Sequence, residues 1–167
     1  NEEGIDDIII VDELGESDKW RNLVKRQYSD YLHKDEFLKM ILADYKIRDG
    51  KFHIAGVSNG GIASLHIAAA NPQYFLSVTA FPGYLWEPTR AKLEAISKMC
   101  VFMYVGENDE YRWHDEMRSE VEFLRAKGTV ARYTVERGQP HRLDTLAGAN
   151  ASRLFDGFEE TKKGCSR

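Results

Sequence analysis

The chain has 167 residues, which fits one domain because domains usually hold roughly 100–200 residues, and 43% of its residues are hydrophobic, enough for an ordinary core. The net charge is −4 with acids and bases interspersed, which excludes the basic surface of a nucleic-acid-binding protein. No stretch approaches the roughly 20 consecutive apolar residues that a membrane-spanning helix needs. We therefore expect a single domain over residues 1–167, with no nucleic-acid partner and no membrane span.

The two cysteines, Cys100 and Cys165, stand far apart, one in an apolar run and the other in a polar tail. A disulfide between them is one alternative. We expect instead two free thiols in a reducing compartment and, with no secretory signal visible, a cytoplasmic protein. Because the chain begins with Asn1 rather than a methionine, we expect its true start to be missing or removed.

In the first half of the chain, predicted strands alternate with predicted helices. The run DIIIVDE (7–13) is rich in β-branched residues and is the first predicted strand. In YLHKDEFLKMILADYKI (31–47) the apolar residues recur near helical spacing, and KFHIAGV (51–57) is the next strand. The alanine-rich NGGIASLHIAAANP (59–72) predicts a helix that stops at its final proline, before the strand FLSVTAFP (75–82).

The second half continues the alternation. The segment from Tyr84 to Met99 leaves room for one short helix before the strand CVFMYVG (100–106). The segment YRWHDEMRSEVEFLRAKG (111–128) gathers apolar residues on one face and ends at a capping glycine. The run VARYTVE (130–136) alternates, as is typical of a strand near a sheet edge, and LDTLAGANASRLFDGFEETKK (143–163) predicts the final helix.

Most of these strands are continuously hydrophobic, which is typical of strands covered on both faces. Strands that alternate with helices predict a mostly parallel sheet with helices packed on both sides. The expected fold class is therefore α/β, with three layers in the order α/β/α.

A lone serine stands between glycines where the strand 51–57 gives way to the helix 59–72. The residues Gly56-Val57-Ser58-Asn59-Gly60 match G-x-S-x-G in a strand–turn–helix setting. Such a turn strains the serine backbone and exposes its hydroxyl, and side chains at the flanking glycines would collide with their neighbours. Free backbone N–H groups at the helix start, those of Asn59 and Gly60, are candidate donors to an oxyanion. An ordinary glycine-rich turn that binds a phosphate is the alternative.

A serine nucleophile needs a base, and the base needs an acid that orients it. Asp109 follows the predicted strand 100–106, and His141 follows the predicted strand 130–136. With Ser58, these residues all fall at the carboxyl ends of strands, where open α/β sheets build their sites. We therefore expect Ser58, His141 and Asp109 to act together.

Rivals exist for the base and for the acid. Four other histidines fit worse, because they lie within predicted strands or helices: His33, His53, His66 and His114. Glu107 and Asp115 are the rivals of Asp109, which the short turn after the strand favours. No cysteine or histidine cluster has metal-ligand spacing, so we expect neither a metal nor an organic cofactor.

The stretches IAGVSNGGIASLHIAAANP, FPGYL, VFMYVGENDEYRW and VERGQPHRLDTL resemble the α/β-hydrolase family. Within that family they look most like small serine esterases of the dienelactone-hydrolase and feruloyl-esterase-like type. The resemblance covers residues 49–158 and leaves residues 1–48 as an atypical N-terminal part. It implies an α/β-hydrolase-like domain that lacks a cap domain and some N-terminal strands, since few residues precede the serine.

The N-terminal part carries two expectations that follow from this resemblance. Family members donate half of the oxyanion hole from a loop after the third strand, and the corresponding positions here would be Asp12, Glu13, Leu14 and Gly15, where backbone N–H groups could serve although acidic side chains beside an oxyanion are unfavourable. The alternative is that this segment is the fourth strand and that the oxyanion loop lies in sequence not present. The strand 51–57 should lie inside the sheet, so either the strand 7–13 pairs beside it, with Ile9 and Ile10 buried, or a separate protein chain or a second copy covers the exposed edge.

The sequence thus predicts a serine hydrolase that cleaves a carboxylic ester or thioester, a small molecule or an acyl ester, through an acyl-enzyme on Ser58. The alternative is an inactive hydrolase-fold protein that serves as a structural or interaction subunit of a larger assembly.

Overall fold

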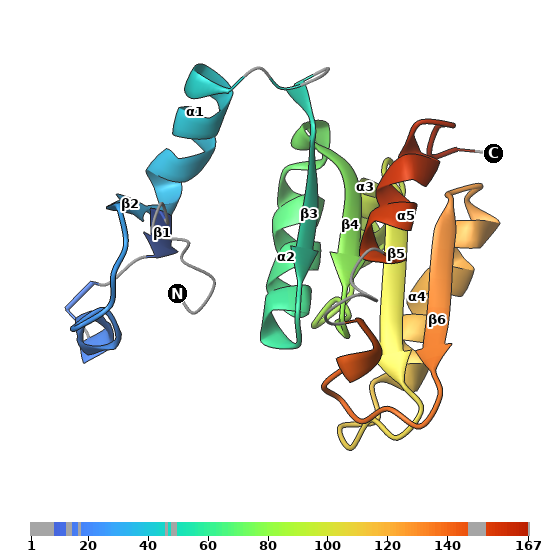
Figure 1. Ribbon diagram of the computed structural model, residues 1–167. Coiled ribbons are helices and arrows are strands. Elements are labelled where there is room, and N and C mark those ends of the chain that lie inside the picture. The colour runs from blue at the N-terminus through green and yellow to red at the C-terminus, as the bar shows by residue number, and fades with distance from the viewer. Residues whose placement is uncertain are drawn as a thin grey trace. The chain divides into compact units, whose positions relative to one another are not determined.

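The computed structural model describes residues 9–12, 15–16, 18–45, 47, 50–146 and 153–166 (Figure 1). Contacts between residues divide the chain into two compact units, Asn1–Gly50 and Lys51–Arg167. The expectation of a single domain over 1–167 stays a prediction. In the described parts, no helix is both long and apolar enough to cross a membrane.

The first unit contains two short parallel strands, β1 (Ile9–Asp12) and β2 (Asp30–His33), followed directly by helix α1 (Lys34–Asp44). A 3-10 helix, η1 (Asp18–Asn22), lies between the strands in sequence. In this unit β1 pairs with β2, and the expected pairing of the strand 7–13 beside the strand 51–57, which belongs to the other unit, stays a prediction.

Strand β2 also corrects the predicted helix 31–47, whose helical part begins only at Lys34. The run Asp30–His33 is short and partly polar, so it carries no strand pattern of its own, and its backbone bonds to β1 determine its conformation. Ile9 is 40% exposed and Ile10 is half-buried, and their burial, expected only if the strand 7–13 pairs beside the strand 51–57, stays a prediction with that pairing.

The second unit holds a parallel sheet of four strands in the order β3 (Phe52–Gly56), β4 (Phe75–Ala80), β5 (Cys100–Gly106) and β6 (Ala131–Glu136). The mostly parallel sheet is confirmed, and β6 is terminal as its alternation predicted. β3 is also terminal in the sheet of this unit, and its expected place inside a larger sheet stays a prediction.

Three helices connect these strands as the sequence predicted: α2 (Asn59–Ala70), α3 (Arg90–Ile96) and α4 (His114–Ala126), with the short 3-10 helix η3 (Pro72–Tyr74) after α2. The 3-10 helix η4 (Asp144–Leu146) and the final helix α5 (Arg153–Thr161) follow β6. Only α3 stands between β4 and β5, as expected for a segment too short to hold a cap domain. α5 lies on the opposite face of the sheet from α2, α3 and α4 (Figure 1).

Strand β5 separates two hydrophobic cores, because its side chains alternate between the faces of the sheet. Val101, Met103 and Val105 pack in one core with residues of α2, α3 and α4. Phe102 and Tyr104 pack in the other, and Gly157 of α5 lies against the Phe102 ring. Both faces are therefore covered, which gives this unit the expected three layers.

A disulfide joins Cys100, the first residue of β5, to Cys165 near the C-terminus. The expectation of two free thiols is therefore wrong. Sequence distance concealed the pair, because the segment after α5 returns to the sheet, where the Val130 N–H donates to the Cys165 carbonyl oxygen at 2.9 Å. The cytoplasmic location stays a prediction, now without the support of free thiols.

One buried carboxyl group in this unit lacks a full set of partners. Glu120 of α4 is 5% exposed, and its Oε1 accepts a hydrogen bond from the Leu85 N–H at 2.8 Å. Its Oε2 has no partner among the described residues. Burial, followed by the charge of Glu116, raises the pKa of Glu120 to about 7, although the hydrogen bond from Leu85 opposes the rise.

Removing the disulfide should destabilise the protein by up to about 4 kcal/mol, since the cross-link closes a loop with a sequence separation of 65 and restricts the unfolded chain. Dithiothreitol should therefore lower the melting temperature of the wild-type protein. The double variant Cys100→Ala/Cys165→Ala should melt lower from the start and should not respond to dithiothreitol. An unchanged wild-type melting temperature under reduction would mean that the thiols are free.

Glu120 should make the protein less stable as the pH rises from about 4.5 to about 7. Over this window the folded protein keeps a proton that the unfolded chain releases, so stability falls by about 3 kcal/mol and then levels off. Glu120→Gln should remove this slope and be more stable than wild type at pH 8. Denaturant unfolding at several pH values tests this, with exposed Glu122→Gln as control. If the free energy of unfolding depends on pH in the same way for wild type and Glu120→Gln, Glu120 is not the group that causes the slope.

Candidate active site

The carboxyl ends of β3, β5 and β6 bring Ser58, Asp109 and His141 together. His141 Nε2 lies 2.7 Å from Ser58 Oγ, and His141 Nδ1 lies 3.1 Å and 3.2 Å from the two carboxylate oxygens of Asp109. The side chain of Asp109 is fully buried, and that of His141 is 11% exposed. A hydroxyl, an imidazole and a carboxylate thus form one hydrogen-bonded chain. Such a chain lets the imidazole take a proton from the hydroxyl.

Ser58 lies on the strained turn that the sequence predicted, with a φ of 56° that is rare for a residue with a side chain. A Cβ atom on Gly56 would come within 2.0 Å of the Gly60 carbonyl oxygen, and one on Gly61 within 2.3 Å of the Pro82 oxygen. Gly60 itself has no atom within 4 Å of such a Cβ, so the expected tight packing at Gly60 is wrong. A side chain at Gly56 or at Gly61 would therefore disrupt the serine turn.

The backbone N–H groups around the turn differ in what they have left to donate. The Gly60 N–H donates to the Val57 carbonyl oxygen at 2.8 Å and is therefore already engaged. The Asn59 N–H, at the first residue of α2, has no acceptor among the described residues. Asn59 is thus the better of these two candidate donors. Leu14, the third candidate, lies outside the described residues.

Glu107 and Asp115, the rivals of Asp109, have partners other than His141. Glu107 Oε2 accepts a hydrogen bond from the Gly138 N–H at 2.8 Å, and Asp115 forms an exposed ion pair with Arg118. Asp109 Oδ1 also accepts the Tyr111 N–H at 2.8 Å, which helps to orient its carboxylate toward His141.

Two rival histidines also have other partners. His53 Nδ1 bonds to Ser77 Oγ at 2.8 Å, its ring stacks on Phe158, and burial lowers its pKa. His114 Nδ1 lies 2.9 Å from the Tyr133 hydroxyl. Neither histidine lies in the hydrogen-bonded chain of Ser58.

Aromatic rings that the sequence patterns did not predict lie beside His141. Tyr111 and Trp113 each contact its imidazole, with ring centroids 4.5 Å and 4.7 Å away. A sequence signal existed, since two aromatic residues follow Asp109 closely, but it equally fits the start of an amphipathic helix.

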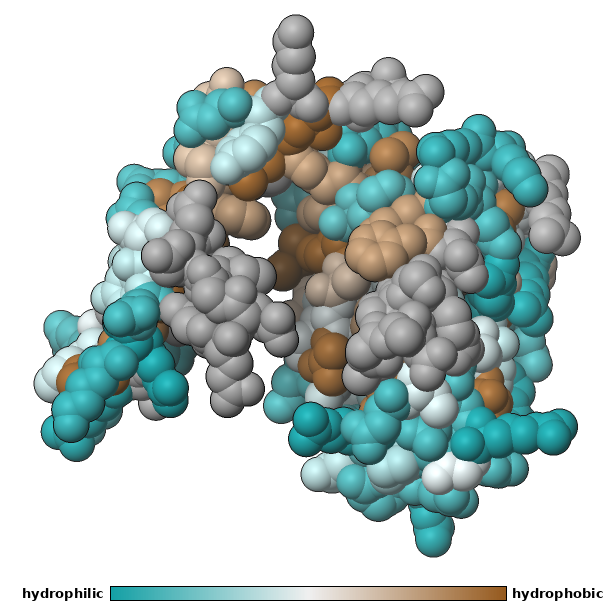
Figure 2. Space-filling view, viewed as in Figure 1, coloured by the Kyte–Doolittle hydropathy of each residue, from teal (hydrophilic) through white to brown (hydrophobic). Residues whose placement is uncertain are grey.

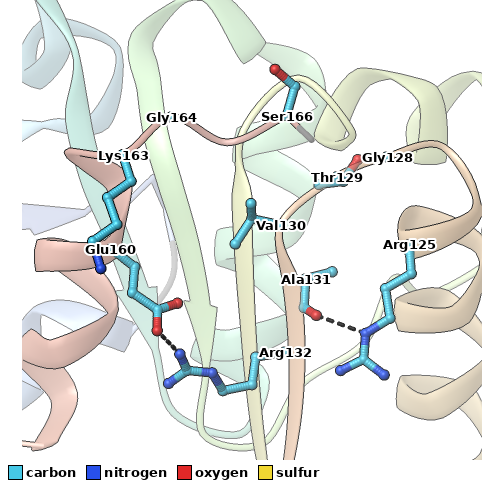
Figure 3. A pocket seen from close by; sticks show the side chains of 10 residues that line it. All are labelled: Arg125, Gly128, Thr129, Val130, Ala131, Arg132, Glu160, Lys163, Gly164 and Ser166. Carbon is cyan, nitrogen blue, oxygen red and sulfur yellow. Dashed lines mark hydrogen bonds and ion pairs between the residues drawn. The ribbon is translucent and has the colours of Figure 1, made fainter.

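A cavity in the described part of the second unit lies away from these residues. Its volume is about 620 Å³, and the ion pair between Arg132 and Glu160 forms part of its wall (Figure 3). Ser58, Asp109 and His141 do not line it. Their own edge of the second unit, below the sheet in Figure 1, is mainly hydrophilic in the space-filling view (Figure 2). In the described ranges, no three acidic, histidine or cysteine side chains gather as metal ligands.

Curated proteins match only part of this chain. The ADP-L-glycero-D-manno-heptose-6-epimerase of Nitratidesulfovibrio vulgaris (strain DP4) is 57% identical over 42 residues. These residues are 25% of this chain and 13% of the epimerase, so the chain spans a small part of the length of the curated relatives it matches.

Solved structures share the fold over most of the chain. Esterase PE8 has a TM-score of 0.62 at 15% identity, covering 92% of this chain and 91% of its own. A dienelactone hydrolase-like promiscuous phosphotriesterase, P91, from metagenomic libraries has a TM-score of 0.61 at 14% identity, covering 95% and 86%. The expected α/β-hydrolase-like fold is confirmed.

The Esterase family model, described as "Putative esterase", matches residues 8–157, which is most of the chain. The expected resemblance to esterases of the α/β-hydrolase family is therefore confirmed. The chain belongs to this esterase family.

Proposed function

We propose that this chain hydrolyses a carboxylic ester or thioester through an acyl-enzyme on Ser58. The observation that carries the proposal is the continuous hydrogen-bonded chain from Ser58 Oγ through both nitrogens of His141 to the buried carboxylate of Asp109. Family membership supports ester hydrolysis in general, and this geometry adds the nucleophile, the base and the orienting acid.

In the first half of the reaction, Ser58 Oγ attacks the substrate carbonyl carbon while His141 Nε2 takes its proton. The buried Asp109 carboxylate stabilises the imidazolium that forms. The carbonyl oxygen becomes an oxyanion, to which the unengaged Asn59 N–H donates. The intermediate then collapses, the C–O or C–S bond breaks, and the leaving alcohol or thiol receives the proton from His141.

The second half repeats these steps with water. His141 takes a proton from a water molecule, whose oxygen attacks the acyl carbon. The ester bond to Ser58 then breaks, and Ser58 Oγ recovers its proton from His141. The carboxylic acid leaves, and the protein returns to its starting state.

The proposed substrates are small or extended esters. The segment between β4 and β5 contains only α3, so no inserted domain covers the site from that position. Tyr111, beside His141, is 62% exposed, in keeping with an open site.

The alternative function is a hydrolase-fold subunit without catalysis. The terminal position of β3 favours association with another chain, because one edge of this strand has no paired strand within the second unit. Labelling of the serine separates the two functions, since only an activated nucleophile reacts.

Ser58→Ala should abolish reaction with a fluorophosphonate probe and with p-nitrophenyl acetate, because the hydroxyl is the attacking group. Intact-mass spectrometry should show one probe molecule on the wild-type protein and none on the variant. Ser119→Ala, which changes an exposed serine of α4, is the matched control and should label like wild type. Equal labelling of Ser58→Ala and wild type would refute the nucleophile, and an unlabelled wild type would favour the subunit.

Asp109→Asn should lower kcat by roughly four orders of magnitude, because an asparagine in this place favours the wrong tautomer of the imidazole. Glu107→Gln and Asp115→Asn are the matched controls and should keep most of the activity. The acid is misassigned if Glu107→Gln loses activity while Asp109→Asn retains it.

A further inference from the structure

The segment from Gly106 to Trp113 contacts the loop of His141 along its whole length. The Asn108 N–H donates to the Gln139 carbonyl oxygen at 2.8 Å. A Cβ atom on Gly106 would meet the Pro140 carbonyl oxygen at 2.1 Å, so the two backbones approach as closely as only glycine allows. The loop before His141 is thus fixed on the end of β5.

The backbone of His141 is held by the same segment. Its N–H donates to Glu110 Oε2 at 3.0 Å, a bond that lowers the pKa of the Glu110 carboxyl group. These contacts place the Cα atom of His141. Rotation of the imidazole about the side-chain bonds is limited by the bonds from Nδ1 to the Asp109 oxygens, at 3.1 Å and 3.2 Å, and by the contact of Nε2 with Ser58 Oγ at 2.7 Å.

Two aromatic rings add a further restraint on the orientation of the imidazole. The Tyr111 ring meets the imidazole at 66° with centroids 4.5 Å apart, and the Trp113 ring meets it at 89° with centroids 4.7 Å apart. Trp113 is itself supported, since the Tyr84 ring meets it at 74° and 5.2 Å. Edge-to-face contacts of this kind are directional, so they favour one orientation of the imidazole.

The backbone between the two rings is strained. Arg112 has a φ of 59°, and its N–H donates to the Asp109 carbonyl oxygen at 3.1 Å, which closes a tight turn. A left-handed conformation at a residue with a side chain persists only where its surroundings impose it, and such strain gathers at functional sites. The turn puts the acid and both rings within one short segment.

We propose that Tyr111 and Trp113 form an aromatic clamp that positions the imidazole of His141. The clamp holds Nδ1 toward Asp109 and Nε2 toward Ser58. Tyr111 and Trp113 are positioning residues, because they act through His141. The inference deepens the proposed function and rests on it for the catalytic part of its test.

The catalytic test compares leucine variants of Tyr111 and Trp113, which lose the aromatic ring, with phenylalanine variants, which keep one. Tyr111→Leu and Trp113→Leu should each lower kcat on p-nitrophenyl acetate by about 10-fold to 100-fold with KM nearly unchanged, because small misplacements of a catalytic group are costly. Tyr111→Phe and Trp113→Phe should restore most of kcat. Phe123→Leu on α4 removes a ring that is not among the described contacts of His141 and should keep wild-type kcat. A higher KM at unchanged kcat would mean that the rings bind substrate, which overturns the clamp.

A second measurement needs no catalysis. In the Ser58→Ala background, proton NMR should show the hydrogen-bonded Nδ1–H of His141 as a slowly exchanging low-field signal. Adding Trp113→Leu should broaden or remove that signal, and adding Trp113→Phe should keep it. An unchanged signal in the leucine variant overturns the clamp. If the wild-type protein fails to react with fluorophosphonate, the proposed function fails, while this signal still decides whether the clamp exists.

Discussion

The burial of β5 on both faces is the constraint on which the rest of the second unit depends. All its residues from Cys100 to Gly106 are buried, and its neighbours β4 and β6 pair with it in parallel. A strand held this way has one register and one end point. The segment that carries Asp109 starts from that end point, and the loop that carries His141 is bonded to the same segment. The end of β5 therefore fixes the positions of both Asp109 and His141.

Ser58 reaches the same edge through β3 and is positioned by a different means. Its N–H donates to the Phe81 carbonyl oxygen at 3.3 Å, and the Phe81 N–H donates to the Gly56 carbonyl oxygen at 2.9 Å. The serine turn is thus tied to the end of β4, which in turn pairs with β5. The strain at Ser58 is maintained because these bonds, with the close backbone contacts at Gly56 and Gly61, leave no room for a relaxed turn.

Local signals explain why the sequence predicted so much of this arrangement. Ser58 belongs to a five-residue pattern, and Asp109 and His141 each follow a hydrophobic run directly, so each could be placed at a strand end without knowledge of the others. What failed depended on contacts between distant segments. Neither the pairing of Asp30–His33 with β1 nor the disulfide between Cys100 and Cys165 produces a periodic pattern in the sequence.

Gly60 and Gly61 show that the sequence pattern does not identify which glycine of the turn needs to lack a side chain. Both belong to the serine turn in sequence, yet only Gly61 faces the Pro82 carbonyl oxygen. Which glycine is indispensable depends on the path of the chain after β4, and the pattern of the turn does not encode that path. The family match spans residues 8–157 and so includes β1, β2 and α1 of the first unit as well as the four-stranded sheet of the second.

The disulfide divides the chain in a way that the sheet does not. Cys100 and Cys165 close a covalent ring that contains Asp109 and His141, while Ser58 lies on the open arm before it. A protease that cuts after Arg142, whose side chain is 91% exposed, would open this ring without releasing a fragment. The nicked molecule would keep its acid, base and nucleophile in one covalent piece, and its two fragments would separate only after reduction.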